Sequence, residues 1–171
     1  MFGLTNLGII HTAISLLAVG AGIVCFLRYG GISMRTSAGR TYVLMTVLTC
    51  LTGFGIFQHG GFGKPHALGI ITLVVLLLAA VASRTKIFGR LSTYVETVSY
   101  SATFFFHMIP ALAEGATRLP PGEPLFSNPE APEILFVTGI FFVFFVLGAS
   151  YQVWKIRSQK HSVGGLSQAA S

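Results

Sequence analysis

The stretch from Ser92 to Glu114, STYVETVSYSATFFFHMIPALAE, decides how this chain folds. On a helix, at about 100° per residue, its main polar side chains fall within an arc of roughly 60°; these are Glu96, Tyr100, Thr103, His107 and Glu114. We call them the polar stripe. The opposite side is apolar and carries Phe104, Phe105, Met108, Ile109 and Leu112. Ionisable residues in a membrane span usually face the protein interior or a site. We therefore expect a helix that turns this stripe toward neighbouring helices.

The composition is that of a membrane protein. Of 171 residues, 53% are hydrophobic and only 9% are charged, whereas about 25% of a soluble domain is charged. Five stretches approach the roughly 20 apolar residues that a span requires; they cover residues 7–27, 41–57, 66–82, 91–113 and 134–154. The sequence predicts an all-α bundle of five transmembrane helices over residues 1–157, followed by a disordered cytoplasmic tail over 158–171.

The basic residues are distributed unevenly between the connecting segments. Nine lie in three segments that fall on one side of the predicted spans: Arg28, Arg35, Arg40, Arg84, Lys86, Arg90, Lys155, Arg157 and Lys160. The other side has Lys64 and Arg118, with Glu114, Glu123, Glu130 and Glu133. By the positive-inside rule this places the N-terminus outside and the C-terminus in the cytoplasm. The basic charge thus fits anionic lipid headgroups and gives no reason to expect nucleic acid.

Three local features complete the expected topology. No Lys or Arg precedes the first apolar run, so we expect that helix to be retained and not cleaved as a signal peptide. Cys25 and Cys50 lie inside the first two spans and are expected to be buried thiols without a disulfide. Five prolines lie in the segment 115–132, which is expected to form an extended cap over the outer mouth.

Four of the five histidines fall in the outer half of the predicted bundle: His11, His59, His66 and His107. At about 1.5 Å per residue, His11 and His107 both lie roughly 6–10 Å below the outer surface. Imidazoles of this kind ligate a transition metal or a b-type haem. They equally form a protonatable pocket for a quinone or another small ligand.

Two ligand sets follow from this arrangement. The equal depth of His11 and His107 makes them the favoured axial pair of a single haem, with His66 in reserve and Tyr100 nearby. A transition metal would use His59, His66 and Glu114. The inner half of the bundle has no second tier of histidines, so we expect one cofactor at most. The chain contains no HxxxH, HExxH or CxxC motif, and we find no catalytic motif.

Two short patterns carry a family resemblance. Gly39-Arg40-x-Tyr42 opens the second predicted helix, and Phe62-x-x-x-His66-x-Leu68 enters the third. Both resemble a group of predicted multi-pass bacterial membrane proteins of unknown function, over the first four helices. The resemblance implies a bacterial inner-membrane protein and brings no activity with it. Arg35 departs from the family pattern because no histidine precedes it.

Three functional interpretations remain open at this point. The first is a protein that binds a haem, metal or quinone near the outer face. The second is a small proton-coupled transporter with Glu96, Tyr100, His107 and Glu114 along its path. The third is a structural or accessory subunit whose polar residues only join helices, although such bonds average under about 1 kcal/mol in membranes. The expected partners are the lipid bilayer and, in addition, a quinone or another membrane protein.

Overall fold

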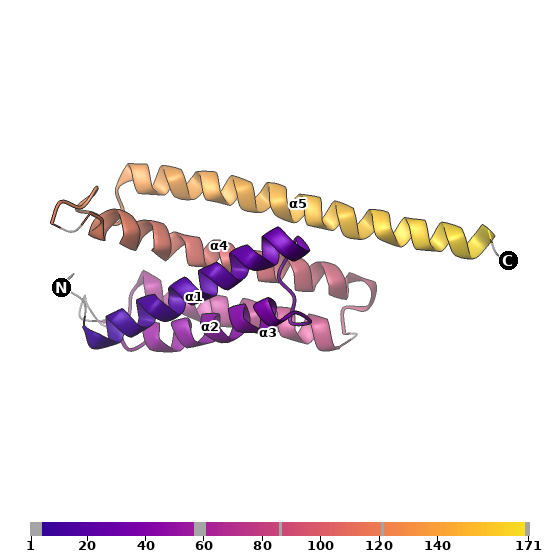
Figure 1. Ribbon diagram of the computed structural model, residues 1–171, viewed down its shortest axis with the longest axis horizontal. Coiled ribbons are helices and arrows are strands. Elements are labelled where there is room, and N and C mark those ends of the chain that lie inside the picture. Colours follow the sequence, from indigo (N-terminus) through magenta and orange to yellow (C-terminus); the bar gives the residue numbers. More distant parts are fainter. Residues whose placement is uncertain (1–4, 57–60, 86, 121, 170–171) are drawn as a thin grey trace.

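The computed structural model describes residues 5–56, 61–85, 87–120 and 122–169, with side chains as far as Gln159. Within these ranges the chain is all-α, as predicted, and contains five α-helices (Figure 1). They are α1 (Asn6–Tyr29), α2 (Ser37–Gly53), α3 (Lys64–Arg84), α4 (Ser92–Arg118) and α5 (Pro132–Ala169), with a 3-10 turn at Gly89–Leu91 before α4. Cys25 and Cys50 are free thiols, as expected.

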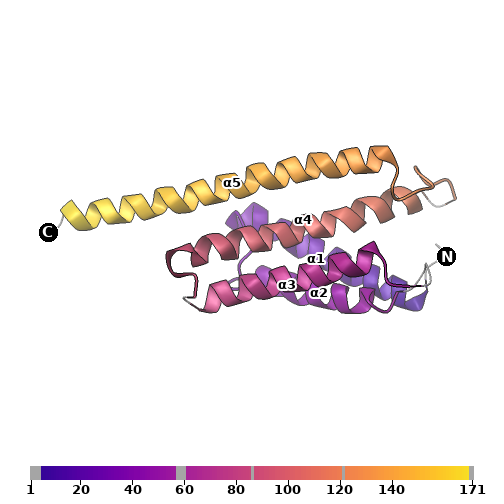
Figure 2. The ribbon, with the colours of Figure 1, turned by 180° about the vertical axis from the view of Figure 1, so that it is seen from behind.

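The first four helices form a bundle and α5 lies along its side. α2 packs between α1 and α3, α3 packs on α4, and a smaller contact between α4 and α1 closes the bundle. α5 packs on α4 and continues beyond the bundle toward the C-terminus (Figures 1 and 2). The start of α1 lies at the same end as the connection from α4 to α5, and the C-terminus lies at the other end (Figure 1).

The helix ends follow local sequence signals. The side chain of Thr5 accepts a hydrogen bond from Gly8 N (3.2 Å), and that of Thr36 accepts one from Gly39 N (3.0 Å). Both are N-caps, which satisfy amides that a helix start leaves without partners. α1 ends where Gly30 adopts φ 73°, a left-handed conformation that glycine enters without steric cost.

Three helices are long and apolar enough to cross a membrane: α1, α3 and the part of α5 from Pro132 to Gln159. Many of their large side chains face outward; Leu27 is 81% exposed and Phe136 is 71% exposed. Such surfaces suit lipid and would be costly in water. The finding supports a multi-pass membrane protein. α2, at 17 residues, and α4, which contains Glu96, Glu114 and Arg118, are not among these three.

Three helix boundaries differ from the prediction. α2 ends at Gly53, earlier than residue 57, because the amides of Gly55 and Ile56 bond to carbonyls three residues back and tighten the chain into a turn. α4 continues through Pro110 and Gly115 to Arg118, so the expected extended cap over 115–132 begins only at Leu119. The helix α5 continues over residues 158–169, where the composition predicts a disordered tail. α5 can continue past the bundle because no proline interrupts it after Pro132, and because its backbone hydrogen bonds are made within the helix itself.

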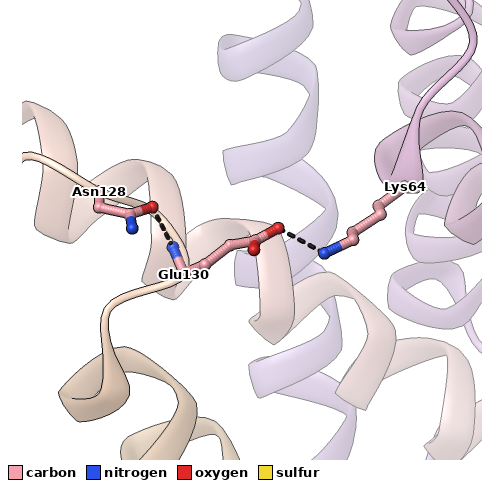
Figure 3. A network of polar contacts seen from close by, with 3 residues as sticks. All are labelled: Lys64, Asn128 and Glu130. Atoms are coloured by element: carbon pink, nitrogen blue, oxygen red, sulfur yellow. Dashed lines mark hydrogen bonds and ion pairs between the residues drawn. The ribbon is translucent and has the colours of Figure 1, made fainter.

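Ion pairs lie at the acidic end of the bundle. Lys64, at the start of α3, pairs with Glu130, whose backbone N donates to Asn128 Oδ1 (2.9 Å) (Figure 3). Arg118 pairs with Glu114 one turn earlier on α4. The two basic residues predicted on this side are thus both joined to carboxylates, and four glutamates against two basic residues give this end a net negative charge.

Candidate functional site

The polar stripe lies partly inside the bundle. Tyr100 and Thr103 have no exposed surface and His107 is 5% exposed. Glu96 is half-buried near the start of α4, and Glu114 is exposed near its end. Residues spaced by three, four and seven positions share one helix face. The middle of this face is buried, so the first and last members of the stripe lie toward the two ends of the bundle.

A hydrogen bond between α2 and α4 crosses the interior. Tyr42 is fully buried, and its hydroxyl lies 2.9 Å from Thr103 Oγ1. The hydroxyl of Thr103 donates its own hydrogen to the carbonyl of Tyr100 (2.8 Å). Thr103 has no second hydrogen to give, so Tyr42 is the donor of the cross-helix bond.

The imidazole of His107 lies next to Tyr42. The two ring centroids are 6.1 Å apart, and the His107 ring interacts with the backbone carbonyl of Thr103, one turn earlier. Its Nε2 is buried and makes no hydrogen bond within the described part of the chain. The interaction with Thr103 therefore belongs to Nδ1, and Nε2 is left as a buried polar atom without a hydrogen-bond partner, which costs free energy in an apolar interior.

His11 is oriented by the end of α2. Its Nδ1 lies 3.0 Å from Thr52 Oγ1, and Thr52 donates its hydroxyl hydrogen to the carbonyl of Leu48 (2.8 Å). With this hydrogen on Leu48, Nδ1 of His11 is the donor to Thr52, and the imidazole also interacts with the backbone of Thr49. Gly53 permits this approach, since a Cβ there would stand 3.2 Å from Cε1 of the imidazole.

His11, His107 and Glu114 lie in the half of the bundle that the charges predict to be outer, but among the described residues they do not gather into one cluster. His11 lies within electrostatic range of both His107 and Glu114. We call His11 and His107 the histidine pair. The buried Nε2 of His107 carries a lone pair, and the exposed side chain of Glu114 lies seven residues further along α4. This set can take up a proton and stabilise it electrostatically.

The other predicted site residues lie elsewhere or have other tasks. Nδ1 of His66 accepts a hydrogen bond from Gly63 N (3.2 Å) at the start of α3, and its ring packs on Phe62. The hydroxyl of Tyr100 faces Ser83 and lies within electrostatic range of Glu96 and Arg84, two turns from His107. His59 lies outside the described residues, so the predicted set of His59, His66 and Glu114 stays a prediction.

The histidine pair offers the ligand atoms that a haem needs, but the protein leaves too little space for the porphyrin. Two imidazole lone pairs are a haem's axial ligands, yet Nε2 of His107 is enclosed by protein atoms. Gly22 brings α1 close to Phe104 and Tyr42, and the Tyr42 ring packs on His107, so this side of His107 has no room for a porphyrin. Among the residues that the structure describes, no three His, Cys, Asp or Glu side chains gather as metal ligands.

Two groups of polar residues that shape the interior were not among the predicted site residues. Tyr42 and Thr52 hold the two histidines, and their spacing from Thr46, Thr49 and Gly53 along α2 is a small-and-polar face that signals close helix packing. Gln152 is 8% exposed and bonds to Ser101 and to the Gly30 carbonyl. In the sequence, Gln152 could be noticed as a single amide side chain within an apolar stretch.

No protein-family model, curated protein or solved structure matches this chain. The function must therefore be argued from the arrangement of its own residues.

Proposed function

We propose that this chain is a five-span membrane protein of the bacterial inner membrane, and that its working site is the histidine pair. In this proposal His11 and His107 bind and release a proton near the outer face, and protonation governs the binding of a small membrane ligand such as a quinone. The predicted haem is the less favoured occupant because of the close packing around His107.

One observation carries the proposal: the buried Nε2 of His107 has no hydrogen-bond partner within the described residues. A purely structural helix would gain stability by replacing such a group with an apolar side chain. A proton needs no cavity. An enclosed lone pair on His107, within electrostatic range of a second imidazole that is itself within range of Glu114, therefore suits proton uptake.

Five spans are supported by packing and length. α2 is about 26 Å long at 1.5 Å per residue, close to the roughly 30 Å of a hydrocarbon core. It packs between α1 and α3, both apolar enough to cross, so it follows their direction through the bilayer. α4 packs between α3 and α5 and turns its charged residues inward or toward the ends.

The topology is tested by reporter fusions. A reporter active only in the cytoplasm, fused after Gln159, should be active, and one inserted after Glu123 should be silent. Activity at both positions, or at the second alone, would contradict the proposed orientation.

The proton site is tested by nuclear magnetic resonance of ¹⁵N-histidine in nanodiscs. Two imidazoles that share a proton titrate in coupled steps. We expect the signals of His11 and His107 to show two shared steps in the unmodified protein. In His11→Asn, His107 should titrate in one step. His66→Asn is the matched control, because this histidine caps α3, and it should leave both steps unchanged.

Two results would refute the proton site. One is a His107 signal that does not titrate over the range in which the protein stays folded. The other is a titration of His107 that is the same with and without His11. Either would leave the polar residues as helix contacts and favour the structural interpretation.

A second candidate is a small proton-coupled carrier. It is favoured by the continuation of the site toward the other end of the bundle, where the Tyr42–Thr103 bond lies between His107 and Tyr100, and Tyr100 lies near Glu96. In proteoliposomes with an imposed potential, Glu96→Gln should slow pH equilibration if protons cross by this route. Equal rates for both proteins would rule out this candidate and leave the proton site near the outer face intact.

A further inference from the structure

An apolar groove runs along the side of the bundle between α1 and α5. Both helices contact α4, and in the described structure they do not pack on each other. The groove measures about 360 Å³. Phe26 of α1 forms one wall, Phe144 and Gly148 of α5 form the other, and Phe104, Phe105 and Met108 of α4 form the floor. Its lining is almost wholly apolar, although Ser101 and Gln152 lie at one end.

That end is closed by hydrogen bonds and is basic. Ser101 Oγ donates to Gln152 Oε1 (2.8 Å), and Gln152 Nε2 donates to the carbonyl of Gly30 (2.8 Å). The ammonium of Lys155 lies beside Gly30, 3.8 Å from where a Cβ would stand. Arg28 is two residues from Gly30 in the chain, and its side chain is exposed. The apolar groove thus leads to positive charge at the end predicted to be cytoplasmic.

The volume of the groove indicates what kind of ligand it can hold. A helix with side chains is about 10 Å across and would fill 360 Å³ in less than one turn of about 5.4 Å. The groove is therefore too small for a partner helix and suits a single hydrocarbon chain. Basic pockets between membrane helices on the cytoplasmic side bind anionic lipid headgroups. Lys155 supplies a phosphate partner at the end where such a headgroup would lie.

We propose that this groove binds one acyl chain of an anionic phospholipid of the cytoplasmic leaflet, with the lipid phosphate at Lys155 beside Gly30. The lipid covers the apolar strip between α1 and α5, and so joins α5 to the four-helix bundle. The site is separate from the histidine pair, and it rests on α1 and α5 crossing the membrane in the orientation proposed above.

The test measures lipid retention by native mass spectrometry, with phosphatidylglycerol and phosphatidylcholine as the probes. Gly148→Leu fills the groove, and Gly139→Leu is its matched control on the same helix. An added Cβ meets no atom within 4 Å at either glycine, so neither change forces the fold apart. We expect Gly148→Leu to lose at least tenfold in phosphatidylglycerol affinity and Gly139→Leu to keep it.

Lys155→Gln tests the headgroup independently of groove packing, because this side chain is exposed. A basic residue near anionic headgroups contributes about 1 kcal/mol, so phosphatidylglycerol should bind about fivefold more weakly. Phosphatidylcholine should lose less, because its choline group neutralises the phosphate. Three outcomes would overturn the proposal: equal affinity of the unmodified protein for both lipids, equal retention by the two glycine variants, or no effect of Lys155→Gln.

Discussion

Gly22→Ala is the sharpest test of how α1 meets α4. A Cβ at Gly22 would stand 2.5 Å from both Cδ2 and Cε2 of Phe104, and 3.2 Å from Cδ2 of Tyr42. Carbon atoms in contact are normally about 3.5–4.0 Å apart. The Phe104 ring has little room to retreat, since Phe26 lies edge-on to it at 5.1 Å and Tyr42 at 6.3 Å. The helices or the ring must move.

The expected change in the free energy of unfolding combines two opposing effects. Overpacking of an interior costs about 1–3 kcal/mol, while alanine favours a helix over glycine by about 1 kcal/mol. Gly20→Ala isolates the first term, because a Cβ at Gly20 meets nothing within 4 Å. We therefore expect the free energy of unfolding of Gly22→Ala to lie about 1–3 kcal/mol below that of Gly20→Ala.

The assay is reversible denaturant unfolding in micelles, followed by circular dichroism, for both glycine variants. Phe104→Leu is then combined with Gly22→Ala in a double-mutant cycle, which measures the interaction between the two positions. Leucine removes the ring atoms that the new methyl meets, so part of the lost stability should return. Equal stability of the two glycine variants would show that α1 does not approach Phe104 in this way.

Three further changes have expected outcomes. Tyr42→Phe keeps the ring beside His107 and removes the donor to Thr103, so unfolding should become easier by about 0.6 kcal/mol and by no more than about 1.7 kcal/mol; a larger loss would mean that the hydroxyl holds more than this one bond. Lys64→Gln removes a pair whose side chains are 85% and 59% exposed, and it should cost under about 1 kcal/mol at low salt and less at high salt by thermal denaturation. His66→Leu removes the acceptor for Gly63 N, and should cost about 0.5–2 kcal/mol with faster exchange of that amide; unchanged exchange would exclude the cap.

Much of the architecture was readable from local patterns. Hydropathy and periodicity predicted five helices, because a helix satisfies its own backbone and its apolar run is set by neighbouring residues. The uneven basic charge predicted an orientation, and Pro65 predicted the start of α3 within a few residues. The polar stripe predicted which face of α4 is buried, since residues three and four apart share one side of a helix.

The contacts between helices depended on the tertiary structure. Sequence placed His11 and His107 at a similar depth, but only the packing of the four-helix bundle brought Tyr42 and Thr52 to their rings and left Nε2 of His107 enclosed. The groove beside α5 likewise exists because α1 and α5 both pack on α4 and, in the described part of the chain, touch each other only at its closed end, through Gln152 and Gly30. Such features depend on how helices cross and rotate, and those angles are fixed by side chains far apart in the chain.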